Sequence, residues 1–456
     1  MSQTASGRRH DWEYWYTIIA LLFLSNALYP FLYDLVGIRI DTYGDSNRLN
    51  LAFAALIYLI AGLLILKSPA NALRVLEQNP FIVALLLLPL LSELWSVDPG
   101  TTFRRAAAYT LTGVFCIYIA GRLSPEQFLK RLMLVVLIGG VASLLYAILL
   151  PRYGIMQGGM NLGSWEGVYG QKNDLGRIST IALIVSYFVQ PANLTERFYK
   201  YLTISIFLFL LVASQSRTNW LIVSGVVVLV PLLRMLRNRR FALSLRLLTV
   251  LSFSAGFALL VLFGTEQILA AVGRDDTFSG RETLWRGVTT IVNAHYPILG
   301  AGYGAFWTDN GGVQELASYL SYWSSKPDQA HSGYLNARAD LGAVGLVMLV
   351  IFLVIASAQL LRRIIREPHR PVWPAFACLM FFFLINNITE TVAFKHSDIT
   401  WSIVLIVAFY AGTYQKQPVR RPVQAAPKAI HYGSVAFKPV KVAESALLRP
   451  SPGNSG

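Results

Sequence analysis

The chain has 456 residues, of which 55% are hydrophobic and only 14% are charged, and its formal net charge is +15. A soluble domain carries about 25% charged residues, so the composition excludes an ordinary soluble protein and predicts an integral membrane protein. The positive charge does not indicate nucleic acid as a partner, because Lys and Arg lie mainly in short loops between apolar stretches. The cysteines Cys116 and Cys378 lie far apart inside apolar stretches, which suggests neither a disulfide framework nor a thiolate metal site.

Apolar stretches recur along almost the whole chain. A membrane-spanning helix needs about 20 mostly apolar residues, and the sequence therefore predicts an all-α integral membrane protein with about twelve transmembrane helices. The first stretch is too long and too aromatic for a cleaved signal peptide. The expected spans are residues 14–36, 50–66, 79–95, 106–121, 131–150, 174–190, 199–213, 219–234, 247–264, 334–360, 373–389 and 398–415.

The distribution of Lys and Arg predicts the orientation of these helices. If residues 1–13 are cytoplasmic, most of the 39 Lys and Arg residues fall on the cytoplasmic side. This excess favours an arrangement with both the N-terminus and the C-terminus in the cytoplasm, and we expect a multi-pass protein of a bacterial inner membrane. Residues 416–456 are rich in Pro, Ala and Lys, which indicates a disordered basic cytoplasmic tail close to anionic membrane lipids.

A long polar segment, residues 265–333, separates the first nine expected helices (14–264) from the last three (334–415). It contains many Trp and Tyr residues, so it is too aromatic to be disordered. We expect a compact, partly helical periplasmic loop that forms a lid over the outer face of the helices. Its aromatic side chains either form a small core or, if exposed, stack on sugars.

Three ionisable residues lie at the expected outer ends of spans, where such residues are costly and often functional. Arg217 is in a short outer turn, Arg281 is early in the long loop, and His331 precedes the tenth span. Arginine grips phosphate oxygens with a planar fork of donors, and histidine can take a proton from a sugar hydroxyl. The alternatives are an interfacial anchor for Arg217, a solvated charge for Arg281 and a structural loop contact for His331.

The sequence gives little support for a metal or an organic cofactor. It contains no Asp-x-Asp triplet, and the doublet Asp275-Asp276 has no second carboxylate cluster near it. A divalent-metal mechanism therefore has weak support, and we expect no cofactor.

Short motifs in a fixed order resemble the bacterial O-antigen ligase and O-antigen or exopolysaccharide polymerase superfamily. The strongest is His331-Ser332, followed after nine residues by Gly342-Ala343-Val344-Gly345, glycines that fit close helix packing in a membrane. Many members of the family carry Asn where Ser332 stands. The other similar segments are Ser92–Pro99 with Thr102, Arg104 and Arg105, Gly167–Asn173, Ser214–Thr218, Ser279–Trp285 and Asn386–Thr391.

The resemblance implies a membrane glycosyltransferase of the lipid-phosphate-sugar-using type that inverts the anomeric carbon without a metal. Its donor would be a glycan on undecaprenyl diphosphate, and its acceptor a lipid-linked repeat unit or lipid A-core. His331 matches the family's catalytic histidine, and Arg217 and Arg281 match its pyrophosphate-binding arginines. Arg104, Arg105, Lys172, Glu390 and Trp285 either contact a substrate or hold loops together.

The spacing of the early and late motifs is more similar to exopolysaccharide polymerases than to O-antigen ligases, so a polymerase is our first expectation and a ligase the second. A transporter of lipid-linked sugars would predict inverted repeats and polar residues at the membrane midplane, whereas the polar residues here gather at the outer face. A structural assembly protein would leave the two arginines and the histidine unexplained.

Overall fold

The computed structural model describes residues 3–28, 30, 48–158, 161–236, 242–259, 279–320 and 326–413. Within these ranges the chain is helical, and one isolated β-bridge joins Ile155 to Trp165. The helices of the first half are α1 (Gln3–Leu24), α3 (Arg48–Lys67), α4 (Pro69–Glu77), α5 (Pro80–Leu91), η2 (Ser92–Trp95), α6 (Pro99–Arg122), α7 (Pro125–Leu149), α8 (Pro151–Gly154), η4 (Gly167–Tyr169) and α9 (Lys172–Phe188). The second half contains α10 (Leu194–Ala213), α11 (Arg217–Leu236), α12 (Leu243–Leu259), α14 (Ser279–His295), α15 (Val313–Tyr319), α16 (Gly333–Arg366), α17 (Val372–Thr389) and α18 (Ile399–Gly412).

Several helices begin where a capping residue precedes a proline. Ser124 caps α7 through the Gln127 amide, and the Gln127 side chain accepts from the Ser124 amide in return. Asp98 caps α6 by accepting a hydrogen bond from the Thr101 amide. Such caps satisfy amide groups that the first helical turn leaves without partners, so these short polar turns end one helix and start the next.

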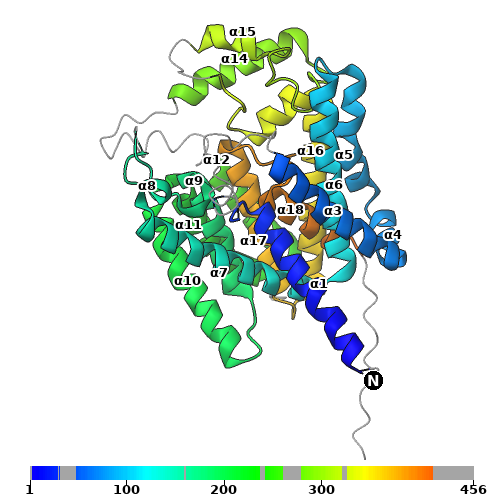
Figure 1. Cartoon of the computed structure of the whole chain (residues 1–456), viewed down its shortest axis with the longest axis vertical. Helices are drawn as coiled ribbons and strands as arrows, with labels where there is room; N and C mark the ends of the chain where they lie inside the picture. The colour runs from blue at the N-terminus through cyan, green and yellow to red at the C-terminus, as the bar shows by residue number, and fades with distance from the viewer. Residues whose placement is uncertain are drawn as a thin grey trace, which may run out of the picture. The chain divides into compact units, whose positions relative to one another are not determined.

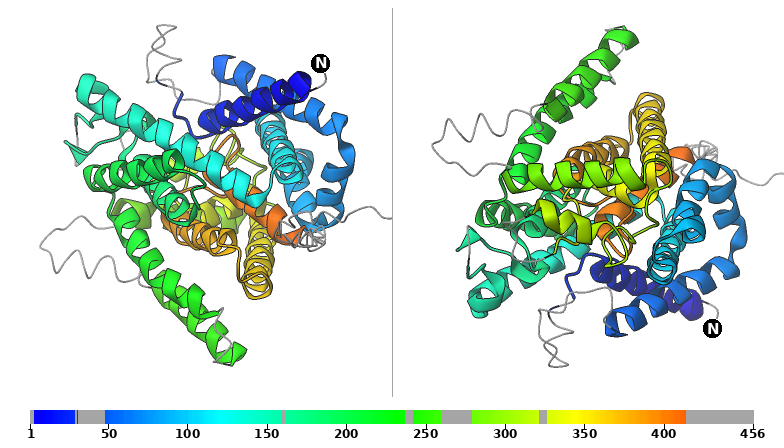
Figure 2. Two further views of the ribbon diagram at one scale, coloured as in Figure 1. Left: turned by 90° about the horizontal axis from the view of Figure 1, so that it is seen from below. Right: turned by 90° about the horizontal axis from the view of Figure 1, so that it is seen from above.

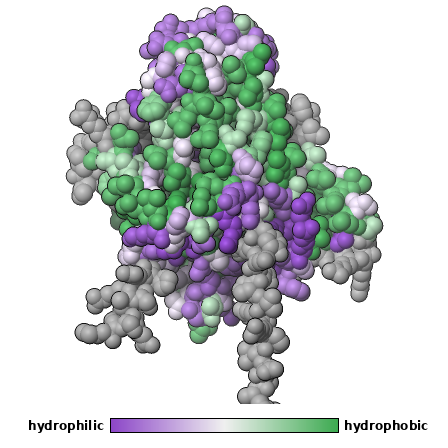
Figure 3. All heavy atoms as spheres, turned by 90° about the vertical axis from the view of Figure 1, so that its right-hand side faces the viewer, coloured by the Kyte–Doolittle hydropathy of each residue, from purple (hydrophilic) through white to green (hydrophobic). Residues whose placement is uncertain are grey.

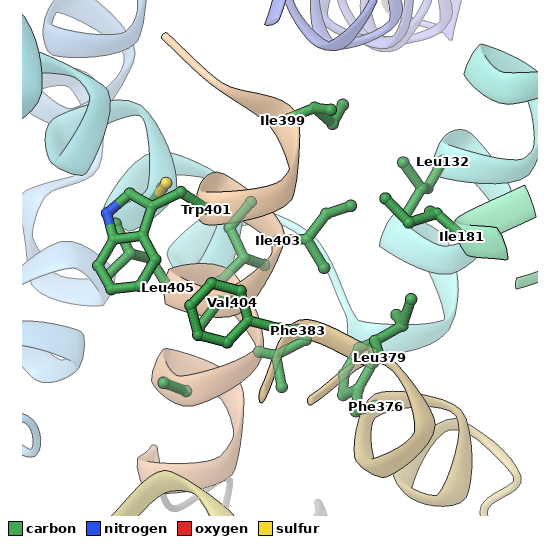
Figure 4. Close-up of a cluster of buried hydrophobic side chains, with 14 of the residues drawn as sticks. Leu132, Ile181, Phe376, Leu379, Phe383, Ile399, Trp401, Ile403, Val404 and Leu405 are labelled. Atoms are coloured by element: carbon green, nitrogen blue, oxygen red, sulfur yellow. The ribbon is translucent and has the colours of Figure 1, made fainter. Parts of the chain in front are cut away.

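The centre of the bundle is formed by α17 and α18. Every residue of α18 from Ile399 to Ala411 is buried, as expected for a helix that is apolar on all sides. Figure 4 shows part of this core, where Trp401 on α18 and Phe383 on α17 lie close together, with ring centroids 5.5 Å apart. A fully packed core of this kind fixes the ends of α17 and α18, which carry part of the candidate site.

The arrangement of apolar residues fits a multi-pass membrane protein. Five described helices are long and apolar enough to cross a membrane, or six if the bent pair Pro69–Glu77 and Pro80–Trp95 is one span. Figure 3 shows a broad apolar band between two more polar ends on the face it presents. Exposed Leu, Ile and Val residues of this kind, such as Leu59 and Leu66 on α3, suit contact with lipid chains.

Each of the twelve expected spans overlaps a helix, but the number of spans stays a prediction. Several of these helices are shorter than a full crossing, including α18 with 14 residues and α9 with 17. The first expected span continues past α1 into residues 31–47, which lie outside the described residues, as do residues 260–278 and the tail 416–456.

The bundle has two chemically different ends. One end joins helix termini through ion pairs of basic residues, among them Arg122–Glu13, Lys130–Glu196 and Arg370–Glu126. The other end carries α14 and α15, which lie across the bundle in Figures 1 and 2. All the motifs quoted above for the site begin or end there, and we call it the motif end.

Residues 279–320 form a folded unit on the motif end, which we call the lid. Its small core contains Leu284, Val288, Ile291, Phe306 and Leu316, all fully buried. Trp285, Tyr296 and Trp307 pack against this core, which favours the structural interpretation of the loop aromatics that the structure describes. Tyr322 and Trp323 lie outside the described residues.

The lid is fastened to α16 at a break in that helix. Gly342 has φ +64° and ψ −161° inside α16, a backbone conformation that glycine adopts most easily. The break frees the Ala343 and Val344 amides, which donate to the carbonyls of Pro297 and Ile298 at 3.1 Å each. The expectation that Gly342 serves helix packing was therefore wrong: the backbone that approaches it belongs to the lid, and an added Cβ would lie 2.2 Å from the Ile298 oxygen.

Candidate functional site

His331 lies at the start of α16, between the lid and the bundle. Its φ of +48° is in the left-handed region, which is uncommon for a residue other than glycine and is found often at functional sites. Its side chain is 28% exposed, and Nδ1 lies 4.0 Å from Oε2 of Glu390. The next residue, Ser332, is buried and is the N-cap of α16. The sequence therefore places a partly accessible imidazole in a constrained backbone position.

Glu390 is the residue that connects the motifs. Its Oε1 accepts a hydrogen bond from Asn173 Nδ2 at 2.9 Å and lies 3.3 Å from Arg281 Nη2. Arg281 also donates to the Thr389 carbonyl at 2.7 Å. Burial alone would raise the pKa of the Glu390 carboxyl, but contact with His331 and the positive charges of Arg281 and Arg177 hold that pKa below its usual value. Glu390 is therefore an anion placed between a histidine and two arginines.

Arg217 lies at the same end, and the residue before it contacts this cluster. It is the exposed first residue of α11. The preceding Ser216 donates to Asn173 Oδ1 at 3.1 Å, and the same Asn173 amide group donates to Glu390. The turn that holds Arg217 and the end of α17 that holds Glu390 are thus linked through a single side chain. Sequence reasoning quoted Asn173 inside a motif but gave it no role.

A buried ion-pair network supports the cluster from within the bundle. Arg177 on α9 contacts Asp174 at 3.0 Å and Asp398, before α18, at 3.3 Å. The side chains of Arg177 and Asp398 are 6% and 2% exposed, and buried charges are tolerated when they are paired. Sequence reasoning missed this network, although an arginine inside an apolar stretch was a signal.

Four further residues from the sequence motifs lie at the motif end without forming one cluster. Arg105 donates to the Gly304 carbonyl of the lid at 2.8 Å, and Trp285 donates to the Ala330 carbonyl, beside His331, at 2.8 Å. Both contacts favour the role of holding loops together. Lys172 begins α9 and is partly exposed, and Arg104 is exposed on α6.

A cavity of about 770 Å³ lies between α12, α14, α16 and α17. Its wall within the bundle is apolar, and its polar lining includes Ser332, next to His331, and Arg338. Arg338 is partly buried and donates to Asn293 Oδ1. The apolar wall is formed by Leu251, Ala255, Leu346, Phe381, Leu384, Ile385 and Ile388. Sequence reasoning missed Arg338 because nothing in its neighbours marks it apart from other outer charges.

The described residues contain no group of three or more His, Cys, Asp or Glu side chains placed to hold a metal ion. The chemical groups that the site offers are therefore an imidazole, a carboxylate and several guanidinium groups, next to an apolar cavity. This set suits the binding of an anionic group and the movement of a proton.

Comparison with known proteins agrees with the motifs. A family model described as O-antigen ligase matches residues 202–350, a range that contains Arg217, Arg281 and His331. The exopolysaccharide production protein ExoQ of Rhizobium meliloti (strain 1021) is 27% identical over 301 residues, which are 64% of this chain and 67% of that protein. The resemblance of this multi-pass membrane protein to the O-antigen ligase and polysaccharide polymerase superfamily is thereby confirmed.

Proposed function

We propose that the protein transfers a glycan from undecaprenyl diphosphate to a sugar hydroxyl at the periplasmic face of the bacterial inner membrane. The family match and the relative support a polysaccharide polymerase or ligase role. The orientation is supported by the basic residues at the end opposite the lid, among them Arg122, Lys130 and Arg370, because basic residues gather on the cytoplasmic side of a membrane.

The observation that carries this proposal is the cavity beside His331. Its apolar wall, formed mainly by α12 and α17, suits the part of a polyprenyl chain nearest the diphosphate. Its polar lining at Ser332 and Arg338 lies next to His331 in the chain or on the same helix, and it supports binding of the diphosphate near the histidine. A lipid-linked sugar needs both surfaces side by side, whereas a soluble nucleotide sugar needs no apolar wall of this kind.

In the proposed reaction, His331 removes the proton from the acceptor hydroxyl as the oxygen attacks the anomeric carbon. The bond between that carbon and the diphosphate oxygen breaks, and the electron pair leaves with undecaprenyl diphosphate. Arg217 and Arg281 bind the diphosphate and stabilise the charge that develops on it. A single displacement of this kind inverts the anomeric carbon, and it requires neither a metal nor a cofactor.

The preferred acceptor is a lipid-linked repeat unit, so that the enzyme polymerises exopolysaccharide. This choice is supported by the motif spacing and by the relative, whose name describes exopolysaccharide production. Transfer of finished polysaccharide to lipid A-core is the alternative, because the matching family is described as O-antigen ligase. Transport of lipid-linked sugars or a structural role would not require His331.

The first test is His331→Ala in a deletion strain of the native host, with lipid-linked glycans and surface polysaccharide measured at equal membrane abundance. The matched control is His295→Ala, because His295 lies in the lid, pairs with Glu315 at 3.2 Å and is 54% exposed. We expect polymer to be lost and single lipid-linked repeat units to accumulate only with His331→Ala. Accumulation of full-length lipid-linked polymer would identify a ligase, and normal polysaccharide would contradict a catalytic role for His331.

A further inference from the structure

Glu390 holds the end of α17 against the chain next to His331. Its amide donates to the Asn386 carbonyl at 2.9 Å, and its carbonyl accepts from the Gly333 amide at 3.1 Å. Gly333 leaves no room for a side chain, since an added Cβ would lie 1.9 Å from Asn387 Oδ1. The backbone of Glu390 is therefore held at Gly333, two residues after His331.

The two carboxylate oxygens of Glu390 face different partners. Oε1 lies 3.3 Å from Arg281 Nη2, and Oε2 lies 4.0 Å from His331 Nδ1. The same side chain thus contacts both the proposed base, His331, and a cation proposed to bind the donor, Arg281. Asn173 holds Oε1 from a third direction at 2.9 Å, so the orientation of the carboxylate is itself determined.

A direct contact between Glu390 and the donor would be unfavourable. A carboxylate and a diphosphate are both anions and repel each other at short distance. The Glu390 side chain is only 22% exposed, and its charged neighbours are His331 and Arg281, with Arg177 also acting on it. Its surroundings suit a group that orients cations and an imidazole better than a group that binds the substrate.

We propose that Glu390 is a positioning residue. It orients His331 for proton removal and holds Arg281 at a fixed position relative to His331. This inference rests on the proposed function. In it, the Nδ1 proton of His331 faces the carboxylate, and Nε2 accepts the proton of the acceptor hydroxyl. When Nε2 takes the acceptor proton, Glu390 stabilises the resulting imidazolium, and the proton later passes from Nε2 to water.

The charges around this pair determine the expected effect of pH. Glu390 faces His331 and Arg281, while Arg177 acts on it from α9 and is itself paired with Asp174 and Asp398. Loss of the carboxylate charge removes the negative group that stabilises the imidazolium. The neutral, active imidazole then persists to lower pH, although it is a weaker and less well oriented base.

The test is the pH–rate profile of Glu390→Gln. The purified full-length protein in lipid nanodiscs would receive lipid-linked glycan extracted from the deletion strain. We expect the plateau rate to fall about 10- to 100-fold, which is less than the roughly 10²- to 10⁴-fold that a general base itself contributes, and the acid limb to move to lower pH. Glu390→Asp should recover part of the rate and keep the wild-type acid limb, because it restores the charge.

Two comparisons separate positioning from a loss of structure. Glu315→Gln is the matched control, because Glu315 also faces a histidine, His295, but on the exposed lid surface; we expect its profile to equal that of the wild type. The double variant His331→Ala with Glu390→Gln should be no slower than His331→Ala alone, because both changes act through the same group.

An unchanged acid limb in Glu390→Gln, or rate losses that multiply in the double variant, would overturn the positioning role while leaving the proposed function intact. Full activity of His331→Ala would instead overturn the proposed function itself. If Glu390→Gln does not fold, the profile of Glu390→Asp decides: full wild-type rate and profile with the shorter carboxylate would contradict the dependence on distance that positioning requires.

Discussion

At the motif end, the carboxylate of Glu390 lies 3.3 Å from Arg281 Nη2 and 4.0 Å from His331 Nδ1. The sequence analysis selected His331, Arg281 and Glu390, and in the structure Glu390 lies within 4.0 Å of each of the other two side chains. The position of Glu390 between the other two residues could not be predicted from the sequence, because it depends on the long-range packing of α14, α16 and α17. Asn173 was assigned no role for the same reason.

Arg338 offers a prediction at the scale of one residue. Arg338→Gln removes the positive charge from the lining of the cavity, so the donor diphosphate loses a charge-assisted contact. We expect the donor KM to rise about tenfold, since such contacts contribute about 1.5–3 kcal/mol, while kcat changes little. The measurement is the steady-state rate against donor concentration.

The matched control for Arg338→Gln is Arg286→Gln. Arg286 lies in the lid, but it is 76% exposed and pairs with Glu282 on the same helix. Its donor KM should stay at the wild-type value. Equal changes in the two variants would mean that only the overall charge of this face matters, and would exclude a specific contact by Arg338.

Among the elements, the helices were easier to predict than the contacts between them. Apolar periodicity and capping residues mark the helices themselves, as at Ser124 and Asp98. The break in α16 was not predicted, because Gly342 and Gly345 also fit the pattern of small residues between packed helices. Only the backbone contacts with Pro297 and Ile298 reveal what Gly342 does.

Gly342→Ala tests the junction between the lid and α16. The new Cβ would lie 2.2 Å from the Ile298 oxygen at a φ of +64°, so we expect a loss of stability of about 1–3 kcal/mol together with reduced activity. Thermal unfolding in detergent and protease sensitivity of the lid would measure it. The control is Gly62→Ala in α3, where an added Cβ meets nothing within 4 Å, and stability should be equal or higher.

For the molecule as a whole, composition and Lys and Arg placement predicted a helical membrane protein, and the structure agrees with five to six membrane-capable helices. The count of spans cannot be obtained from hydropathy alone, because α9 and α18 are short and lie within the protein core. Their burial, and not contact with lipid, explains their composition.

The orientation of the bundle can be tested with cysteine labelling, because the native Cys116 and Cys378 are both buried. Asn310→Cys places a thiol on the exposed lid surface, and Thr195→Cys places one at the opposite end. A membrane-impermeant maleimide should label the first in intact spheroplasts and the second only after permeabilisation. The reverse pattern would place the motif end in the cytoplasm.

The position of Glu390 has a consequence for the biosynthesis of the protein. Its partner Asn173 lies 217 residues earlier and Arg281 lies 109 residues earlier, so the carboxylate is made long after the groups that it holds. A nascent chain that has inserted α11 and folded its lid already has the arginines, but the cluster is incomplete until α17 enters the membrane. Synthesis itself thus delays assembly of the site until the bundle is almost finished, and a chain truncated before α17 would leave the histidine without its carboxylate.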